Sequence, residues 1–134
     1  VLAGPSSFIT KARRLRKVTG GGMRQAGLLA AAAIYALEHN FPRMQEDHRR
    51  LEEIRAALSQ LAGLDVPPSV DSNILFFEVD NGPALVEALE SRHGLLLGSY
   101  GPRRVRITTH PNIGDEDVQR VIRALSTEVR NMRI

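Results

Sequence analysis

Residues 16–27 read RKVTGGGMRQAG, so three consecutive glycines lie between a basic segment and the start of an alanine-rich run. Glycine loses more conformational freedom on folding than any other residue, so three in a row indicate a sharp turn or a close approach to another group. Because Arg24 stands at the start of a helical pattern, an anion is one candidate for that group. The alternative is a flexible linker between two helices.

The composition is that of a folded domain with a small excess of positive charge. The 134 residues include 18 Lys and Arg against 15 Asp and Glu, and only 4% are aromatic. This balance is too weak to indicate nucleic-acid binding. The chain has no cysteine and no histidine pair at ligand spacing, so we expect no metal site. No apolar run approaches the roughly 18 residues of a membrane helix, and the first five residues do not resemble a signal peptide.

The first 41 residues predict a strand end followed by two helices. Residues 1–4 are apolar and stop before Pro5, and domains seldom begin inside a buried strand, so we expect a piece of a longer polypeptide. Ser6 and Ser7 are candidate N-caps for a basic helix over residues 8–18. Residues 24–40 are apolar nearly all the way round, which is typical of a helix that is buried on most sides or lies in an interface.

The rest of the chain alternates between the periods of helices and strands. It predicts helices at residues 44–62, 84–93 and 115–133, strands at 73–80, 95–98 and 103–110, and a turn at 81–83. The predicted fold class is α/β overall, and α+β in this part, where a small sheet is covered by helices.

Arg106 is the candidate binding residue of the last strand. Side chains alternate along a strand, so Val105 and Ile107 share one face while Arg104, Arg106 and Thr108 share the other. An arginine held in mid-strand presents a planar fork that suits a carboxylate. The alternative is that this face is simply in contact with water. Because the residues include no pair of nucleophile and base, they indicate anion binding without a catalytic group.

Four segments resemble the low-specificity L-threonine aldolases: the glycine segment at 16–27, YAL at 35–37, QEDH at 45–48 and VRITTH at 105–110. The resemblance covers essentially the whole chain. It implies a cytoplasmic pyridoxal-phosphate enzyme of the aspartate-aminotransferase fold that cleaves L-threonine or L-allo-threonine to glycine and acetaldehyde. It further implies that residues 1–41 are the end of the large cofactor-binding domain with an interface helix, and that residues 42–134 are the small C-terminal domain.

The resemblance also implies roles for particular residues. Arg106 matches the arginine that binds the substrate α-carboxylate. Arg24 matches an arginine near the cofactor phosphate that reaches across a subunit interface. Lys17 matches a lysine on the loop that borders the active site. The Schiff-base lysine of the family lies before residue 1, so this chain is expected to hold no catalytic residue and to be inactive alone. The expected partners are an amino-acid substrate, the remainder of its own polypeptide and further copies in a dimer of dimers, with no nucleic acid and no membrane.

Two other functions stay open. A non-enzymatic module would bind an acidic partner through its basic first helix, and that binding would weaken steeply with salt. A different pyridoxal-phosphate reaction on the same fold is the other, because a fold does not determine a function.

Overall fold

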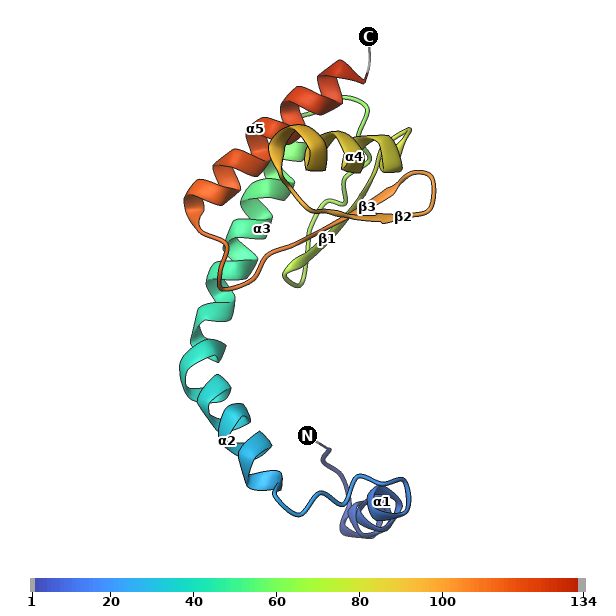
Figure 1. Ribbon diagram of the computed structural model, residues 1–134, viewed down its shortest axis with the longest axis vertical. Helices are drawn as coiled ribbons and strands as arrows, with labels where there is room; N and C mark the ends of the chain where they lie inside the picture. Colours follow the sequence, from blue (N-terminus) through green and yellow to red (C-terminus); the bar gives the residue numbers. More distant parts are fainter. Residues whose placement is uncertain (1, 133–134) are drawn as a thin grey trace. The chain divides into compact units, whose positions relative to one another are not determined.

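The structure, a computed structural model, describes residues 2–132. These residues form two compact units, one extending to Glu38 and the other beginning at His39 (Figure 1). Among the described helices, none combines the length and the apolar character that crossing a bilayer requires.

The first unit begins with helix α1 (Ser6–Val18). Pro5 occupies the N-cap position, and its carbonyl accepts from the Ile9 amide at 3.0 Å. Ser6 and Ser7 therefore lie inside the first turn, and the prediction that they cap the helix was wrong. Residues 2–4 belong to no strand, because they pair with no other strand between residues 2 and 132; Val1 lies outside the described residues.

Helix α2 (Ala26–Tyr35) follows the glycine segment and confirms the helical pattern predicted there. It leads into a π-helical turn, η1 (Ala36–Asn40), and a 3-10 turn, η2 (Phe41–Arg43). Pro42 accounts for this break, because proline has no amide hydrogen to donate to the carbonyl four residues earlier. Between residues 2 and 46 no side chain is buried, and only Ile9, Ala12 and Ala36 are half-buried.

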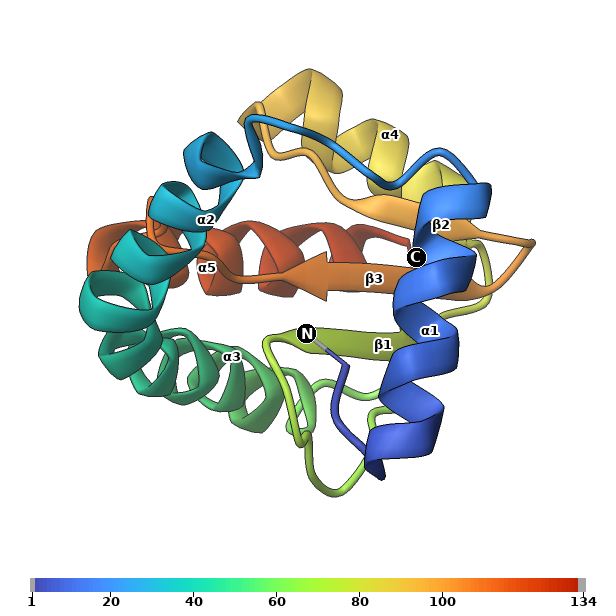
Figure 2. The same cartoon turned by 90° about the horizontal axis from the view of Figure 1, so that it is seen from below.

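The second unit is a three-stranded antiparallel sheet with three helices on one face. Its elements are α3 (Met44–Leu58), β1 (Ile74–Glu78), α4 (Gly82–His93), β2 (Gly98–Tyr100), β3 (Arg104–Thr108) and α5 (Asp115–Asn131). The strand order is β1-β3-β2, so β3 is central and pairs with both neighbours. Helix α3 contacts β1, α4 contacts β2 and β3, and Figure 2 shows α5 passing behind β3, which confirms the predicted α+β arrangement of helices on a small sheet.

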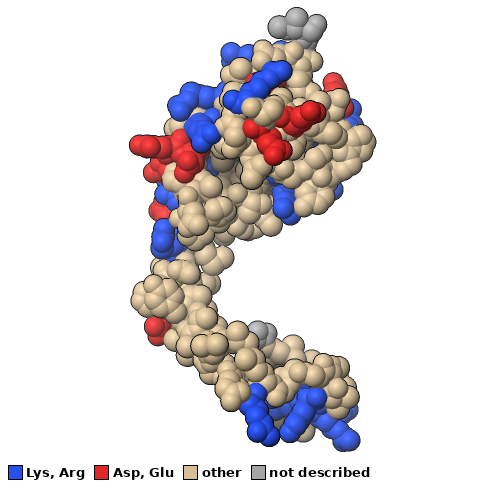
Figure 3. Space-filling view, viewed as in Figure 1, with Lys and Arg blue, Asp and Glu red and all other residues tan. Residues whose placement is uncertain are grey.

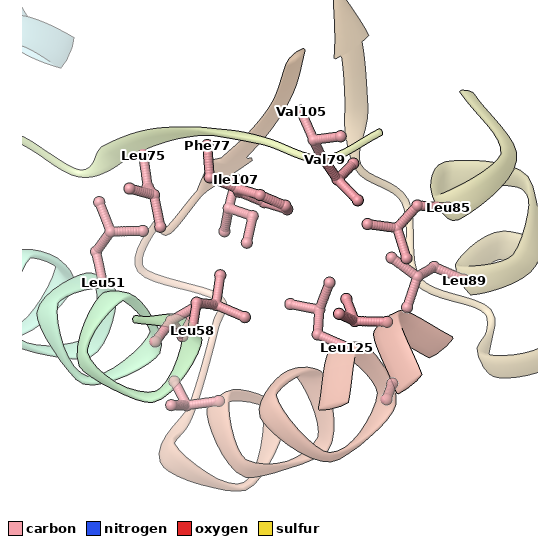
Figure 4. Packing of buried hydrophobic residues seen from close by; sticks show 14 residues of the cluster. Leu51, Leu58, Leu75, Phe77, Val79, Leu85, Leu89, Val105, Ile107 and Leu125 are labelled. Atoms are coloured by element: carbon pink, nitrogen blue, oxygen red, sulfur yellow. The ribbon is translucent and has the colours of Figure 1, made fainter. Parts of the chain in front are cut away.

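The hydrophobic core lies between the sheet and these helices (Figure 4). Side chains at alternate strand positions point into it, as the two-residue period of a strand dictates. The core consists of Leu51, Ile54, Leu58, Leu75, Phe77, Val79, Leu85, Leu89, Val105, Ile107, Val118, Ala124, Leu125 and Val129. The other face of the sheet, which carries Phe76 and Arg106, is not packed against these helices.

Most elements differ from the sequence-based prediction by one or two residues at an end, and three differences are informative. Helix α3 ends at Leu58 instead of residue 62. The predicted turn at residues 81–83 is the start of α4, where the Asn81 side chain accepts from the Ala84 amide at 3.1 Å. The strand predicted at residues 95–98 lies at Gly98–Tyr100 instead, because the Leu95 amide donates to the Leu89 carbonyl and continues the end of α4.

Candidate carboxylate and phosphate sites

Arg106 lies at the centre of the open sheet face. It occupies the middle of β3, where its cross-strand neighbours are Phe76 of β1 and Gly98 of β2. The residues before and after it, Val105 and Ile107, are buried in the core, which fixes the direction of the strand's side chains. Arg106 itself is half-buried. The predicted alternation therefore holds, and it places this arginine on the face opposite the helices.

Two aromatic rings and two guanidinium groups lie together on this face. The Arg106 Cζ lies 5.1 Å from the centroid of the Tyr100 ring, and the Arg104 Cζ lies 4.6 Å from that of Phe76. The two rings meet edge to face, with centroids 5.7 Å apart and planes at 76°. These distances are those of cation–π contacts and of a favourable aromatic pair. We call these four residues the arginine–aromatic cluster.

The charge of Arg106 is not neutralised within the described chain. Between residues 2 and 132, no carboxylate lies within 4.0 Å of the Arg104 or Arg106 guanidinium groups. Arg103, by contrast, pairs with Asp80 at 3.0 Å and with Glu78 at 3.8 Å. Because the guanidinium of Arg106 has no acid partner here, it is available to bind a carboxylate from outside through two parallel hydrogen bonds.

The strand that carries Arg106 is anchored just beyond its end. The buried Thr109 hydroxyl donates to the Asp47 carbonyl of α3 at 2.7 Å, and the Asn73 side-chain amide donates to the Thr109 carbonyl at 2.6 Å. The strand is thereby held against α3 and against the start of β1. A binding group on such a strand keeps a defined position, which a group on a mobile loop does not.

His110, the next residue, belongs to a local turn. Its Nδ1 accepts from the Asn112 amide at 3.3 Å. It borders a hollow of about 380 Å³ between the loop after α4 and the end of β3, which Leu96, Thr108 and Arg120 also line. The guanidinium of Arg120 donates to the His93 carbonyl. No catalytic pair results from these contacts, and residues 2–132 contain no group of three or more His, Asp or Glu side chains suited to a metal ion.

Backbone requirements explain two of the three consecutive glycines. Gly20 has φ +85°, a conformation that favours glycine, and the Gly21 amide donates to the Arg16 carbonyl at 2.7 Å. A Cβ on Gly21 would lie 2.8 Å from Arg16 Cγ and 3.1 Å from its carbonyl oxygen. The segment is therefore a tight return of the chain after α1. Lys17 lies in the last turn of α1, and not in the loop.

Arg24 lies in a turn just before α2, whose N-cap is Gln25. The first turn of α2 contains no acidic residue, so the partial positive charge of its amide groups is not compensated within that turn. Arg24 is exposed. An exposed arginine beside an uncompensated helix N-terminus suits an anion such as a phosphate. Figure 3 shows the basic side chains gathered over α1, in the same unit. The first unit thus carries Lys17 and Arg24, and the second carries Arg106.

An ion cluster around one buried carboxylate, Glu128, lies on the helical side of the sheet. Glu128 of α5 is only 3% exposed and contacts Arg92 at 2.9 Å and His93 Nε2 at 2.8 Å, both from α4. The hydrogen bond with His93, together with the charge of Arg92, lowers the pKa of Glu128 below its ordinary value although burial acts in the opposite direction. This carboxylate is already paired and joins two helices, so we assign it a structural role.

Sequence reasoning missed Phe76, Tyr100 and Gly98 as neighbours of Arg106. Part of their signal was present, because Gly98 and Tyr100 are two residues apart and such residues share a face of a strand. The strand predicted at residues 95–98 would have left Tyr100 outside the sheet, so the contact between the Tyr100 ring and Arg106 could not be predicted.

Comparison with known proteins identifies related sequences. The family model described as beta-eliminating lyase matches residues 1–81. Low-specificity L-threonine aldolase 1 of Arabidopsis thaliana is 39% identical over 123 residues, which cover 88% of this chain and 34% of that protein. Low specificity L-threonine aldolase of Escherichia coli strain K12 is 42% identical over 123 residues, which cover 90% of this chain and 35% of that protein. This chain thus spans about a third of the length of these relatives.

Proposed function

Because this chain belongs to the beta-eliminating lyase family, we propose that it is the C-terminal third of a pyridoxal-phosphate-dependent lyase that cleaves L-threonine or L-allo-threonine to glycine and acetaldehyde. The similarity to two proteins named as low-specificity L-threonine aldolases supports this reaction. The observation within the chain that carries the proposal is the uncompensated Arg106 on the open sheet face.

Arg106 binds the α-carboxylate of the substrate. Its planar fork forms two parallel hydrogen bonds with the two carboxylate oxygens, which fixes both the position and the orientation of the amino acid. Val105 and Ile107, buried on either side, hold the strand in register behind it. A rigid clamp of this kind sets the direction of the bond to be broken relative to the cofactor ring.

Arg24 and the N-terminus of α2 hold the cofactor phosphate. The exposed guanidinium and the amide groups of a helix with no acid in its first turn form a donor set that fits this dianion. Lys17, at the end of α1, borders the site. When bound, pyridoxal phosphate supplies an electron sink for the negative charge left on the α-carbon as the carbon–carbon bond breaks.

The remainder of the polypeptide completes the enzyme. Residues 1–41 form the end of the large domain with its interface helix, residues 42–134 form the small domain, and the lysine that binds the cofactor lies outside this chain. The apolar side chains of α2 support an assembly in which they are covered: Leu28 is 76% exposed, Leu29 62% and Ile34 54%. The assembly is a homotetramer, a dimer of dimers, and the chain alone is inactive.

The substitution Arg106→Lys in the full-length enzyme tests the clamp. Lysine keeps the charge and loses the fork, so kcat/KM for L-threonine, measured as acetaldehyde release, is expected to fall about 100-fold. The matched control is Arg104→Lys, two residues earlier on the same sheet face, for which little change is expected. Near-normal kcat/KM for Arg106→Lys would refute the assignment. Formation of a keto acid in place of acetaldehyde by the unaltered enzyme would indicate an aminotransferase instead.

A further inference from the structure

We propose that Tyr100 and Gly98 are positioning residues that orient the guanidinium of Arg106 toward the substrate carboxylate. The proposal rests on the carboxylate-binding role of Arg106 proposed above. An arginine side chain has several rotatable bonds and loses about 2 kcal/mol of conformational entropy when it is ordered. In the described chain no acid orients Arg106, so another contact must do so.

The ring of Tyr100 provides that contact. Its centroid lies 5.1 Å from the Arg106 Cζ, so the guanidinium lies over the ring. A ring face carries no carboxylate oxygen, so contact with it leaves the N–H groups of a guanidinium, which point outward in its own plane, free to bind a carboxylate. An acidic partner would instead occupy those N–H groups. The aromatic contact therefore orients the fork while leaving its donors open.

Gly98 makes the space in which the ring and the guanidinium meet. A Cβ at this position would lie 2.9 Å from Tyr100 Cε2 and 3.5 Å from Arg106 Nε. Gly98 does not have the positive φ that Gly20 and Gly94 have, so its backbone conformation is open to other residues. The side-chain space alone accounts for glycine here, because a Cβ would overlap the Tyr100 ring in its present position against Arg106.

Phe76 holds the Tyr100 ring from the opposite side of the central strand. The edge-to-face contact between the rings, with centroids 5.7 Å apart, joins β1 to β2 across β3. Tyr100 is 45% exposed at the edge of the sheet, and this contact limits where its ring can turn. Phe76 and Tyr100 thus form a support for Arg106 that is built across all three strands.

The test measures binding of two ligands to the full-length enzyme loaded with its cofactor, followed through the cofactor absorbance. Glycine carries the carboxylate that Arg106 binds, and glycinamide lacks that charge. In Tyr100→Leu, the Kd for glycine is expected to rise about tenfold, while that for glycinamide stays unchanged. The matched control Tyr100→Phe keeps the ring and loses only the hydroxyl, so it should bind glycine like the unaltered enzyme.

Gly98→Ala provides a second, independent test that keeps the ring and displaces it. Like Tyr100→Leu, it should weaken the binding of glycine and leave the binding of glycinamide unchanged. Unchanged glycine binding in both variants, with weakened binding in Arg106→Lys, would overturn the positioning role and leave the proposed function standing. Equal weakening of both ligands would also overturn it, because a general disturbance of the fold would then be the cause. Unchanged glycine binding in Arg106→Lys would overturn the proposed function itself.

Discussion

The two units of the chain contain helices of similar regularity but differ in what surrounds them. In the second unit, 14 hydrophobic residues are buried between a sheet and three helices. In the first, α1 and α2 bury no side chain, although α2 is the more apolar sequence. The contrast shows that an apolar helix sequence indicates that the helix needs a surface to cover its side chains. The sequence of the helix does not say where that surface lies. The second unit meets this requirement itself, whereas the first leaves it unmet within the described residues.

The largest expected effect comes from shortening a core leucine. Leu125 of α5 is fully buried, so Leu125→Ala should lower the free energy of unfolding of the 134-residue chain by about 2–5 kcal/mol. The matched variant is Leu28→Ala in α2, where the side chain is 76% exposed. It should change the free energy by less than about 0.5 kcal/mol, because alanine suits an exposed helix. Urea unfolding followed by circular dichroism measures both.

A larger loss of unfolding free energy for Leu28→Ala than for Leu125→Ala in the 134-residue chain would contradict the contrast between the two units. It would mean that the apolar side chains of α2 are covered in that chain. In the full-length enzyme, where the proposed assembly covers α2, the same Leu28→Ala change is expected to cost about 2 kcal/mol or more. The difference between the two contexts measures how much of the missing surface the rest of the protein supplies.

An intermediate effect is expected at the buried carboxylate of Glu128 in the second unit. Glu128→Gln removes the charge that contacts Arg92 and His93, so the free energy of unfolding at pH 7 should fall by about 2 kcal/mol. The matched control is Glu90→Gln on α4, where the side chain is exposed. Urea unfolding of both variants and of the unaltered chain gives the comparison.

The effect of Glu128→Gln should depend on pH in one direction. Because the pKa of Glu128 is lowered in the folded chain, its charge stabilises the fold above the ordinary pKa of a glutamic acid, about 4.3. The stabilisation decreases as the pH falls below that value and is gone below the lowered pKa. The difference in free energy of unfolding between the unaltered chain and Glu128→Gln should therefore decrease as the pH falls below about 5. A constant advantage would show that packing, and not charge, holds this residue.

Much of the second unit follows from periodicity in the sequence. Alternation at residues 103–110 correctly placed Val105 and Ile107 on one face and Arg106 on the other, and the structure shows that the first of these faces is buried in the core. Burial of one sheet face leaves only one register. The β2 strand was misplaced because Leu95–Leu97 is an apolar run, while Gly98–Tyr100 has little strand character of its own. Pairing with β3 selects that segment, and pairing is a tertiary effect that a local pattern does not contain.

The candidate sites were predictable to different degrees. The position of Arg106 follows from the strand pattern, but its contact with Tyr100 depends on the register of β2. The glycine segment was recognisable, yet the reasons for Gly20 and Gly21, a positive φ and a close approach to Arg16, are visible only in three dimensions. Both cases show that sequence locates a candidate binding residue more easily than it locates the residues packed around it.

The smallest expected effect concerns an exposed ion cluster that joins α3 and α5. Asp115 contacts Arg49 at 2.6 Å and Arg50 at 2.9 Å, and these hydrogen bonds lower the pKa of its carboxyl, but its side chain is 67% exposed. Water and salt screen such pairs, so the urea midpoint of Asp115→Asn should nearly equal that of the unaltered chain. Added salt should not change the difference between the two midpoints. Glu116→Gln, in the same first turn of α5, controls for the loss of a negative charge at the helix N-terminus. A loss as large as that of Leu125→Ala would mean that surface charge, and not the core, holds α3 to α5, and the contrast between the two units would then need a different explanation.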